Sequence, residues 1–225
     1  MIDLETVDQF NLWYLIGLIT SDGSLSKDGR HISITSKDEQ ILVDIKESFA
    51  LSCAVSKKSS GSNREKSYSL LQIGDVAFYH YLLSVGLSPA KSLTLKELVV
   101  PKKYFHDFLR GIIDGDGCIY TWHHPKNKNL QASLRIASAA EIFSKWLFLE
   151  IRELYDVPGQ IIEYTHLNRP NPVYNLKYGK LAAEVILKSC YYNGALANQR
   201  KVSQVNKIFA INSVVRSYTP GWRNW

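Results

Sequence analysis

Two aspartates are the residues of this chain best suited to do chemistry. Asp22 and Asp116 each precede a glycine at the end of an apolar stretch, LIGLITSDG over residues 15–23 and LRGIIDGDG over residues 109–117. The apolar spacing predicts a helix in each stretch. Because the C-terminal end of a helix dipole is negative, it disfavours a carboxylate. A divalent cation would resolve that conflict, and the chemistry it supports is metal-assisted hydrolysis of phosphate esters.

Each of these stretches also carries a glycine in its middle, Gly17 in the first and Gly111 in the second. Aliphatic residues cover most of the circumference of the first helix, so it cannot lie on the surface. A glycine inside a helix costs about 1 kcal/mol of helix propensity, which indicates a packing reason for its presence. We expect the two glycines to let the helices approach closely along a shared seam. That seam would bring Asp22 and Asp116 side by side.

The chain contains an internal repeat. SLLQIGDVAFYHYL over residues 69–82 aligns without a gap to YNLKYGKLAAEVIL over residues 174–187. The two Asp-Gly pairs, and Lys91 with Lys201, fall in the same order, with an offset that grows only between elements. This pattern indicates a tandem duplication with its boundary near Pro101. We therefore divide the chain into two halves, residues 1–100 and 101–225.

Periodicity predicts the same element order, αββαββα, in both halves. Each half begins with a motif helix that ends in an Asp-Gly turn. The predicted helices are 5–20, 38–50, 76–85, 102–114, 139–155 and 180–190, and the predicted strands lie around 31–36, at 55–58 and 68–73, around 131–138, and at 160–165 and 173–178. The predicted fold is α+β, with two pseudo-symmetric αββαββα halves packed through the two motif helices. Each half would have an antiparallel four-stranded sheet with helices on one face, and Ile32, Ile34, Leu134 and Ile136 would point into the core.

Composition places the chain among soluble globular proteins, at 225 residues, 45% hydrophobic and 21% charged. No stretch approaches the roughly 20 apolar residues that span a bilayer. The N-terminus is acidic and resembles neither a secretory signal nor a transit peptide. Three cysteines are too few and too scattered for a zinc site or a disulfide framework. We expect an intracellular protein, cytoplasmic in a prokaryote, with an organelle as the alternative.

Charge points to a polyanion as partner. The 27 Lys and Arg residues outnumber 21 Asp and Glu, which gives a net charge of +6 and a pI near 9.1. Basic side chains gather in two polar loops, and polar ones follow the sheet faces that no helix would cover, which suits readout of a DNA groove. Solvated loops and a solvated sheet face are the alternative. The candidate DNA contacts are His31, Ser33, Thr35, Lys57, Lys58, Arg64, Tyr68, Gln72, His123, Lys126, Lys128, Arg135 and Lys177, with Ser133 on the same outward face.

With its two motifs, the sequence resembles the single-chain LAGLIDADG homing endonucleases. Both copies match at the leucine, glycine and aliphatic positions and at the terminal Asp-Gly, and the fit extends over residues 8–209. The resemblance implies that Asp22 and Asp116 are metal ligands, with Gly23 and Gly117 in the same site. Where the family motif has its first acid, this chain has Thr20 and Asp114. We interpret those two as helix-end or interface residues.

The resemblance further implies an intron-encoded, monomeric endonuclease that makes a double-strand break in a long, asymmetric DNA target. Mg²⁺ would be the cofactor, with Mn²⁺ or Ca²⁺ able to substitute for binding. Lys91 and Lys201 would be catalytic, offsetting charge that develops on the phosphate, and Arg200 is an alternative to Lys201. Ser36 and Ser138 resemble the positions of the family's solvent network.

Other functions on the same fold stay open. The main alternative is an intron maturase, or a DNA- or RNA-binding regulator that does not cleave. The chain shows no flanking splicing blocks, which argues against an intein-borne endonuclease. A purely structural domain would leave the paired acids unexplained. The C-terminal residues Arg216, Trp222, Arg223 and Trp225 could contact DNA, but we favour packing of Trp222 on the fold.

Overall fold

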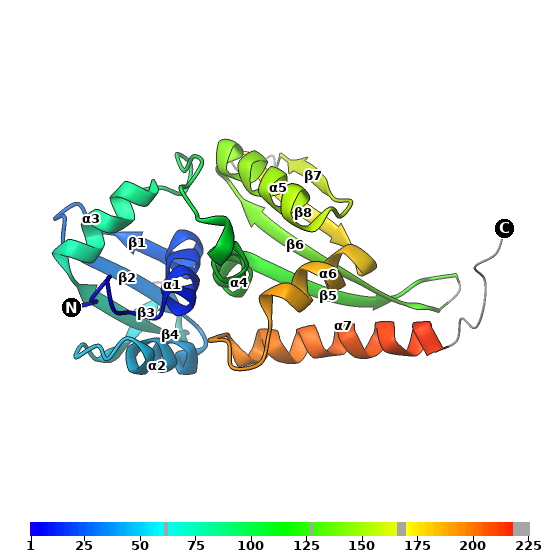
Figure 1. The fold of residues 1–225 in the computed structure, drawn as a ribbon, viewed down its shortest axis with the longest axis horizontal. Helices are drawn as coiled ribbons and strands as arrows, with labels where there is room; N and C mark the ends of the chain where they lie inside the picture. The colour runs from blue at the N-terminus through cyan, green and yellow to red at the C-terminus, as the bar shows by residue number, and fades with distance from the viewer. Residues whose placement is uncertain (61–62, 127, 166–169, 218–225) are drawn as a thin grey trace.

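Two halves of similar architecture meet at a pair of central helices (Figure 1). The computed structural model describes residues 1–60, 63–126, 128–165 and 170–217, with side chains described outside 59–67 and 211–217. The first half consists of α1 (Gln9–Asp22), β1 (Gly23–Leu25), β2 (His31–Ser36), α2 (Glu39–Ser48), β3 (Val55–Ser60), β4 (Asn63–Gly74) and α3 (Val76–Val85). Its strands form one antiparallel sheet in the order β1-β2-β4-β3.

The second half repeats this order. After a short 3₁₀ helix, η1 (Lys102–Tyr104), it contains α4 (Phe105–Asp116), β5 (Gly117–His123), β6 (Leu130–Ser138), α5 (Glu141–Tyr155), β7 (Gln160–Tyr164), β8 (Val173–Gly179) and α6 (Lys180–Cys190). The sheet order is β5-β6-β8-β7, again antiparallel. The predicted fold class is confirmed. The division at residues 100 and 101 stays a prediction.

Strand alternation buries the residues that the sequence indicated. Ile32 and Ile34 on β2, and Leu134 and Ile136 on β6, are at most 1% exposed. Their neighbours along each strand face the other side of the sheet, away from α2 and α5. Each half therefore has one helix-covered face and one open face.

Within the described residues, none of the helices is long and apolar enough to cross a membrane.

The two motif helices pack at backbone contact distance. A Cβ added to Gly17 on α1 would lie 2.0 Å from the carbonyl oxygen of Phe108, and one added to Gly111 on α4 would lie 2.2 Å from that of Tyr14. No side chain fits in that space, so glycine is required at both positions. The predicted close approach of the helices is confirmed.

Several predicted boundaries were wrong: α2 ends at Ser48 rather than residue 50, α5 begins at Glu141 rather than residue 139, and β4 begins at Asn63 rather than residue 68. The first helix begins at Gln9 rather than residue 5, because the Asp8 side chain accepts a hydrogen bond from the Phe10 amide at 2.9 Å and caps the helix there. The motif helices do not end in Asp-Gly turns. Gly23 (φ −93°, ψ 163°) and Gly117 (φ −74°, ψ 144°) are extended, so each helix passes directly into a strand.

A further helix, α7 (Gln199–Ser217), was not predicted. It packs on α6 and β5, where Val205 and Ile208 are buried. Figure 1 shows it running along the edge of the second half. As a result, Lys201 lies in the first turn of a helix rather than in a loop. The C-terminal residues Trp222, Arg223 and Trp225 lie outside the described part of the chain, as does the side chain of Arg216.

Candidate metal and nucleic-acid site

Asp22 and Asp116 end α1 and α4, and the glycine seam between these helices brings the two acids together. Their carboxylates interact. Loss of solvent around Asp116, followed by the charge of Asp22, raises the pKa of Asp116 to about 6. Desolvation also raises the pKa of Asp22, and two lysines oppose that rise. Two acids that repel one another in a partly dehydrated site favour a bound cation.

The two lysines are Lys91 and Lys201, and both are buried, at 6% and 4% exposure. The Lys91 ammonium donates a hydrogen bond to the carbonyl oxygen of Gly23, and the Lys201 ammonium donates to that of Gly117. The two contacts are equivalent in the repeat. Neither lysine is therefore an ordinary solvated surface residue.

Each motif acid interacts more strongly with the lysine of the other half than with that of its own half, whereas Lys201 is attracted first by Asp114 of its own half. Burial lowers the pKa of Lys91, and Asp116 opposes this more strongly than Asp22 does. The charge of Lys201 lowers the pKa of Asp22 more than the charge of Lys91 does. Each lysine thus holds the backbone of its own half while stabilising the carboxylate of the other. The four side chains form one site that neither half could build alone.

The donor set of this site suits a hard divalent cation. Two carboxylates with room for water match the way Mg²⁺ is usually bound in proteins, by one or two carboxylates with several waters. The described residues contain no cluster of three or more His, Cys, Asp and Glu side chains that could hold a metal. The predicted additional ligands, the carbonyls of Gly23 and Gly117, accept lysine ammonium groups here.

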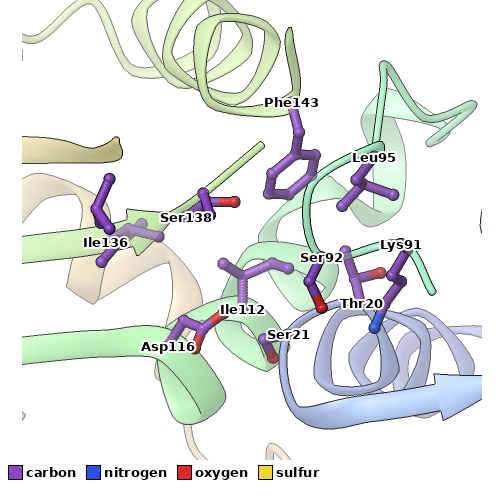
Figure 2. A pocket seen from close by; sticks show the side chains of 13 residues that line it. Thr20, Ser21, Lys91, Ser92, Leu95, Ile112, Asp116, Ile136, Ser138 and Phe143 are labelled. Carbon is purple, nitrogen blue, oxygen red and sulfur yellow. The ribbon is translucent and has the colours of Figure 1, made fainter. Parts of the chain in front are cut away.

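A pocket of about 270 Å³ opens beside Asp116 and Lys91 (Figure 2). Ser21, Ser92 and Ser138 contribute hydroxyl groups to its lining, and Leu95 and Phe143 form part of its apolar wall. Ser138 was expected at a solvent-network position, and it does face this pocket.

Ser36, the counterpart of Ser138, is not among the residues that line this pocket. Both serine hydroxyls accept a backbone hydrogen bond just before a helix, Ser36 from the Asp38 amide at 3.1 Å and Ser138 from the Ala140 amide at 3.2 Å.

Asp114 lies in the interface, as the sequence suggested. It is 4% exposed and accepts hydrogen bonds from the hydroxyls of Tyr14 (2.8 Å) and Tyr191 (2.6 Å) and from the Asn198 amide (2.7 Å). Thr20 donates to the Ile16 carbonyl within its own helix, at 2.7 Å. Three donors hold the buried Asp114 carboxylate, which fits the interface role rather than that of a metal ligand.

Sequence reasoning missed Asp107 and Arg110, which form a buried ion pair at 2.8 Å. The Arg110 guanidinium also lies over the rings of Tyr14 and Tyr192, 5.1 Å from each centroid. The sequence could have indicated this pair, because the spacing of Asp107, Arg110 and Asp114 places all three charged residues on one face of an otherwise apolar helix.

The open face of the first sheet carries most of its predicted contacts. His31, Ser33 and Thr35 alternate along β2, and Ser33 pairs with the exposed Gln72 on β4. Tyr68 pairs with the exposed Lys58. Figure 1 shows this sheet beside that of the other half.

Two other candidates in this half are placed differently. Lys57 alternates with Lys58 and lies toward α2, where its ammonium contacts Glu39 and Ser69. The side chain of Arg64 lies outside the described residues.

The open face of the second sheet is more aromatic. Arg135 and Lys177 are cross-strand neighbours, and the Arg135 guanidinium lies 5.8 Å from the centroid of the Tyr120 ring. Tyr120 stacks on Trp122 at 5.4 Å. Ser133 was expected to be exposed but is 1% exposed, because it sits in the central strand β6 directly opposite Tyr120. His123, Lys126 and Lys128 are exposed at the β5–β6 hairpin.

Comparison with known proteins finds a family model that matches part of the first half and solved structures that share the fold of the whole chain. Residues 9–86 match the family model of the LAGLIDADG-like domain. No curated protein matches the sequence. The LAGLIDADG homing endonuclease I-GzeII in complex with its DNA target is 13% identical, with 94% of this chain and 92% of that one covered at a TM-score of 0.61.

Two other solved structures are similar over both halves. Full-length DUF199/WhiA from Thermatoga maritima is 18% identical with a TM-score of 0.57. The match covers 96% of this chain and 63% of that protein, so the present chain spans less than two thirds of its length. Mesophilic variants of the homing endonuclease I-DmoI are 15% identical at a TM-score of 0.53, with 84% of this chain and 92% of that one covered. These identities show a common fold.

Proposed function

We propose that this chain, whose residues 9–86 form a LAGLIDADG-like domain and whose two halves share the fold of LAGLIDADG homing endonucleases, is a site-specific DNA endonuclease. It would hydrolyse one phosphodiester in each strand of a long, asymmetric DNA site, acting as an intron-encoded, intracellular monomer. The single observation that carries the proposal is the site in which Asp22 and Asp116 meet the buried ammonium groups of Lys91 and Lys201.

The residues of the site have distinct roles in this reaction. Asp22 and Asp116 would hold Mg²⁺ together with phosphate oxygens and water, and the bound ion supplies a nucleophilic water and charge stabilisation for the departing 3′ oxygen. Lys91 and Lys201 would stabilise the negative charge that develops on the phosphate. Their burial strengthens this effect, because a charge interacts more strongly where water is excluded.

The two sheet faces would bind DNA. Tyr68, Gln72, Arg135 and Lys177 would contact base edges, and the hairpin lysines would contact phosphates. Because the first face presents serine, threonine and glutamine while the second presents stacked aromatic rings and arginine, the two half-sites should differ in sequence. Phosphate contacts of this kind weaken steeply with salt.

A non-cleaving nucleic-acid-binding protein, an intron maturase or a regulator, is the second candidate. The observation that favours it is that the carbonyls of Gly23 and Gly117 already accept lysine ammonium groups, which can neutralise the site without a metal. The likeness to DUF199/WhiA over both halves also keeps this candidate open.

Cleavage of a randomised duplex library in Mg²⁺, with sequencing of the cut ends, separates the two candidates. Asp22→Asn and Asp116→Asn are run beside the native protein. Asp156→Asn serves as a control, since Asp156 is exposed at the end of α5 in a left-handed conformation that asparagine tolerates. One asymmetric site, cut by the native protein and the control and lost in both motif variants, supports the endonuclease. Tight binding without cutting, unchanged in both motif variants, refutes it.

A further inference from the structure

We propose that a buried polar stripe on α4, formed by Asp107, Arg110 and Asp114, is a positioning device for Lys201 that has no counterpart at Lys91. This inference rests on the proposed function for its consequence in catalysis, but its structural part can be tested without it. The stripe lies at 4% exposure or less, and the Asp114 carboxylate attracts the Lys201 ammonium, which donates its hydrogen bond to Gly117 rather than to the stripe. The stripe also holds residues 190–198, the segment between α6 and α7 that leads to Lys201.

The stripe binds this segment at both ends. Arg110 donates to the carbonyl of Cys190 at 2.8 Å and to that of Leu196 at 2.9 Å. Asp107 accepts from the Tyr192 hydroxyl at 2.6 Å, and Asp114 accepts from that of Tyr191, also at 2.6 Å. Because the bonds run in both directions and involve charged groups buried from water, they define the position of the segment closely.

The end of the segment connects directly to Lys201. The Asn198 amide donates to Asp114, and the Asn198 side chain accepts from the amide of Arg200 at 3.0 Å, which caps the start of α7. The same side chain donates to Asp38 of the first half at 2.8 Å, and the Arg200 guanidinium donates to Asp38 at 3.1 Å. The first turn of α7, which carries Lys201, is therefore held by both halves.

Lys91 is held by different means. The segment around it buries Leu87, Leu95 and Leu98 and has a backbone turn from the Lys91 carbonyl to the amides of Thr94 and Leu95. On α1, the positions equivalent to the stripe are Trp13, Ile16 and Thr20, which cannot form such a network. A change in the stripe should therefore displace Lys201 and leave Lys91 in place.

Two tyrosine variants test this, because both remove one hydroxyl from the same Asp114 carboxylate. Tyr191→Phe removes the donor that belongs to the 190–198 segment, and Tyr14→Phe removes the donor on α1. Reductive methylation followed by mass spectrometry measures how accessible each lysine ammonium is. We expect Lys201 to be modified about tenfold faster in Tyr191→Phe, with Lys91 unchanged, and both lysines to stay protected in Tyr14→Phe.

Two outcomes of the labelling would overturn the inference. Equal rates of Lys201 methylation in the two variants would show that Asp114 only links α1 to α4 and does not position Lys201. A similar increase at Lys91 and Lys201 in Tyr191→Phe would show general loosening of the fold. Since labelling needs no DNA, it decides the question even for a protein that does not cleave.

Strand-specific cleavage tests the functional consequence. Lys201→Ala and Lys91→Ala first identify which strand depends on which lysine. Tyr191→Phe should then slow cleavage of the Lys201-dependent strand about tenfold and accumulate nicked product, with the other strand cut at the native rate. Equal slowing of both strands refutes the positioning role. A native protein that cuts no duplex refutes the proposed function instead, and the labelling result stands separately.

Discussion

Gly17→Ala should push α1 and α4 apart. The added Cβ would lie 2.0 Å from the carbonyl oxygen of Phe108 and 2.9 Å from its carbon, although real Cβ atoms essentially never come within 3.0 Å of a neighbour. Because both atoms belong to the backbone of the facing helix, no side-chain rotation relieves the overlap. The helices must therefore separate by about 1 Å, a gap at which facing atoms lose roughly a quarter to a half of their dispersion energy.

The size of the effect follows from that separation. Overpacking usually costs about 1–3 kcal/mol, and opening a whole helix seam belongs at or above the upper end. The better helix propensity of alanine returns about 1 kcal/mol. We expect a net loss of about 2–3 kcal/mol in the free energy of unfolding, and a fall in Tm of roughly 4–12 °C for a chain of this size.

Thermal and urea unfolding measure this loss, and Gly179→Ala is the matched control. Nothing lies within 4 Å of a Cβ added at Gly179, whose φ is −72°; because Gly179 is the N-cap of α6, where alanine is less favourable than glycine, that variant should lose no more than about 1 kcal/mol. Combining Gly17→Ala with Gly111→Ala should cost less than the two singly, because one separation relieves both overlaps. If Gly17→Ala is as stable as the Gly179→Ala control, the close helix approach is refuted.

Three further predictions concern charge and DNA contact. The pKa of Asp116 is raised from 3.8 to about 6, so the folded protein binds this proton more tightly than the unfolded chain does and loses stability as pH rises from about 4 to above 6. Asp116→Asn should therefore have a higher Tm than the native protein at pH 8 but not at pH 3.5. An equal difference in Tm at both pH values would contradict this. Arg110→Met leaves the Asp107 carboxylate buried without its partner and should cost about 3–5 kcal/mol in urea unfolding, whereas a cost under 1 kcal/mol would show that the pair is not structural. Tyr120→Ser should weaken DNA binding, measured by fluorescence anisotropy, because Tyr120 is 49% exposed on the open sheet face; the loss of its contacts with Trp122 and Arg135 should cost only about 1 kcal/mol of stability. Leu149→Ser on α5, at a position 59% exposed, should leave the affinity unchanged, and equal affinity of the two variants would exclude this face as the contact.

Much of the fold could be predicted because it repeats local patterns. The alternation of apolar and polar residues around Ile32 and Ile34 predicts a strand from local sequence alone. The ranges of α3 and α6 were predicted to the residue. Helix α7 was missed because its apolar residues do not gather on one helical face, so no continuous apolar stripe marks it along the sequence. Ser133 was misplaced because alternation gives the face of a strand but not how deeply a neighbour such as Tyr120 covers it.

The sequence alone determined that two apolar helices with central glycines present Asp22 and Asp116 at the same end, because glycine spacing and helix periodicity are properties of adjacent residues. It also placed Lys91 and Lys201 at equivalent points of the repeat. Only the tertiary structure decided that these lysines are buried and that each stabilises the acid of the other half. The contacts of Asp114 with Tyr14 and Tyr191 likewise join residues far apart in the chain. Such contacts depend on how whole elements pack, and no spacing within one element encodes that packing.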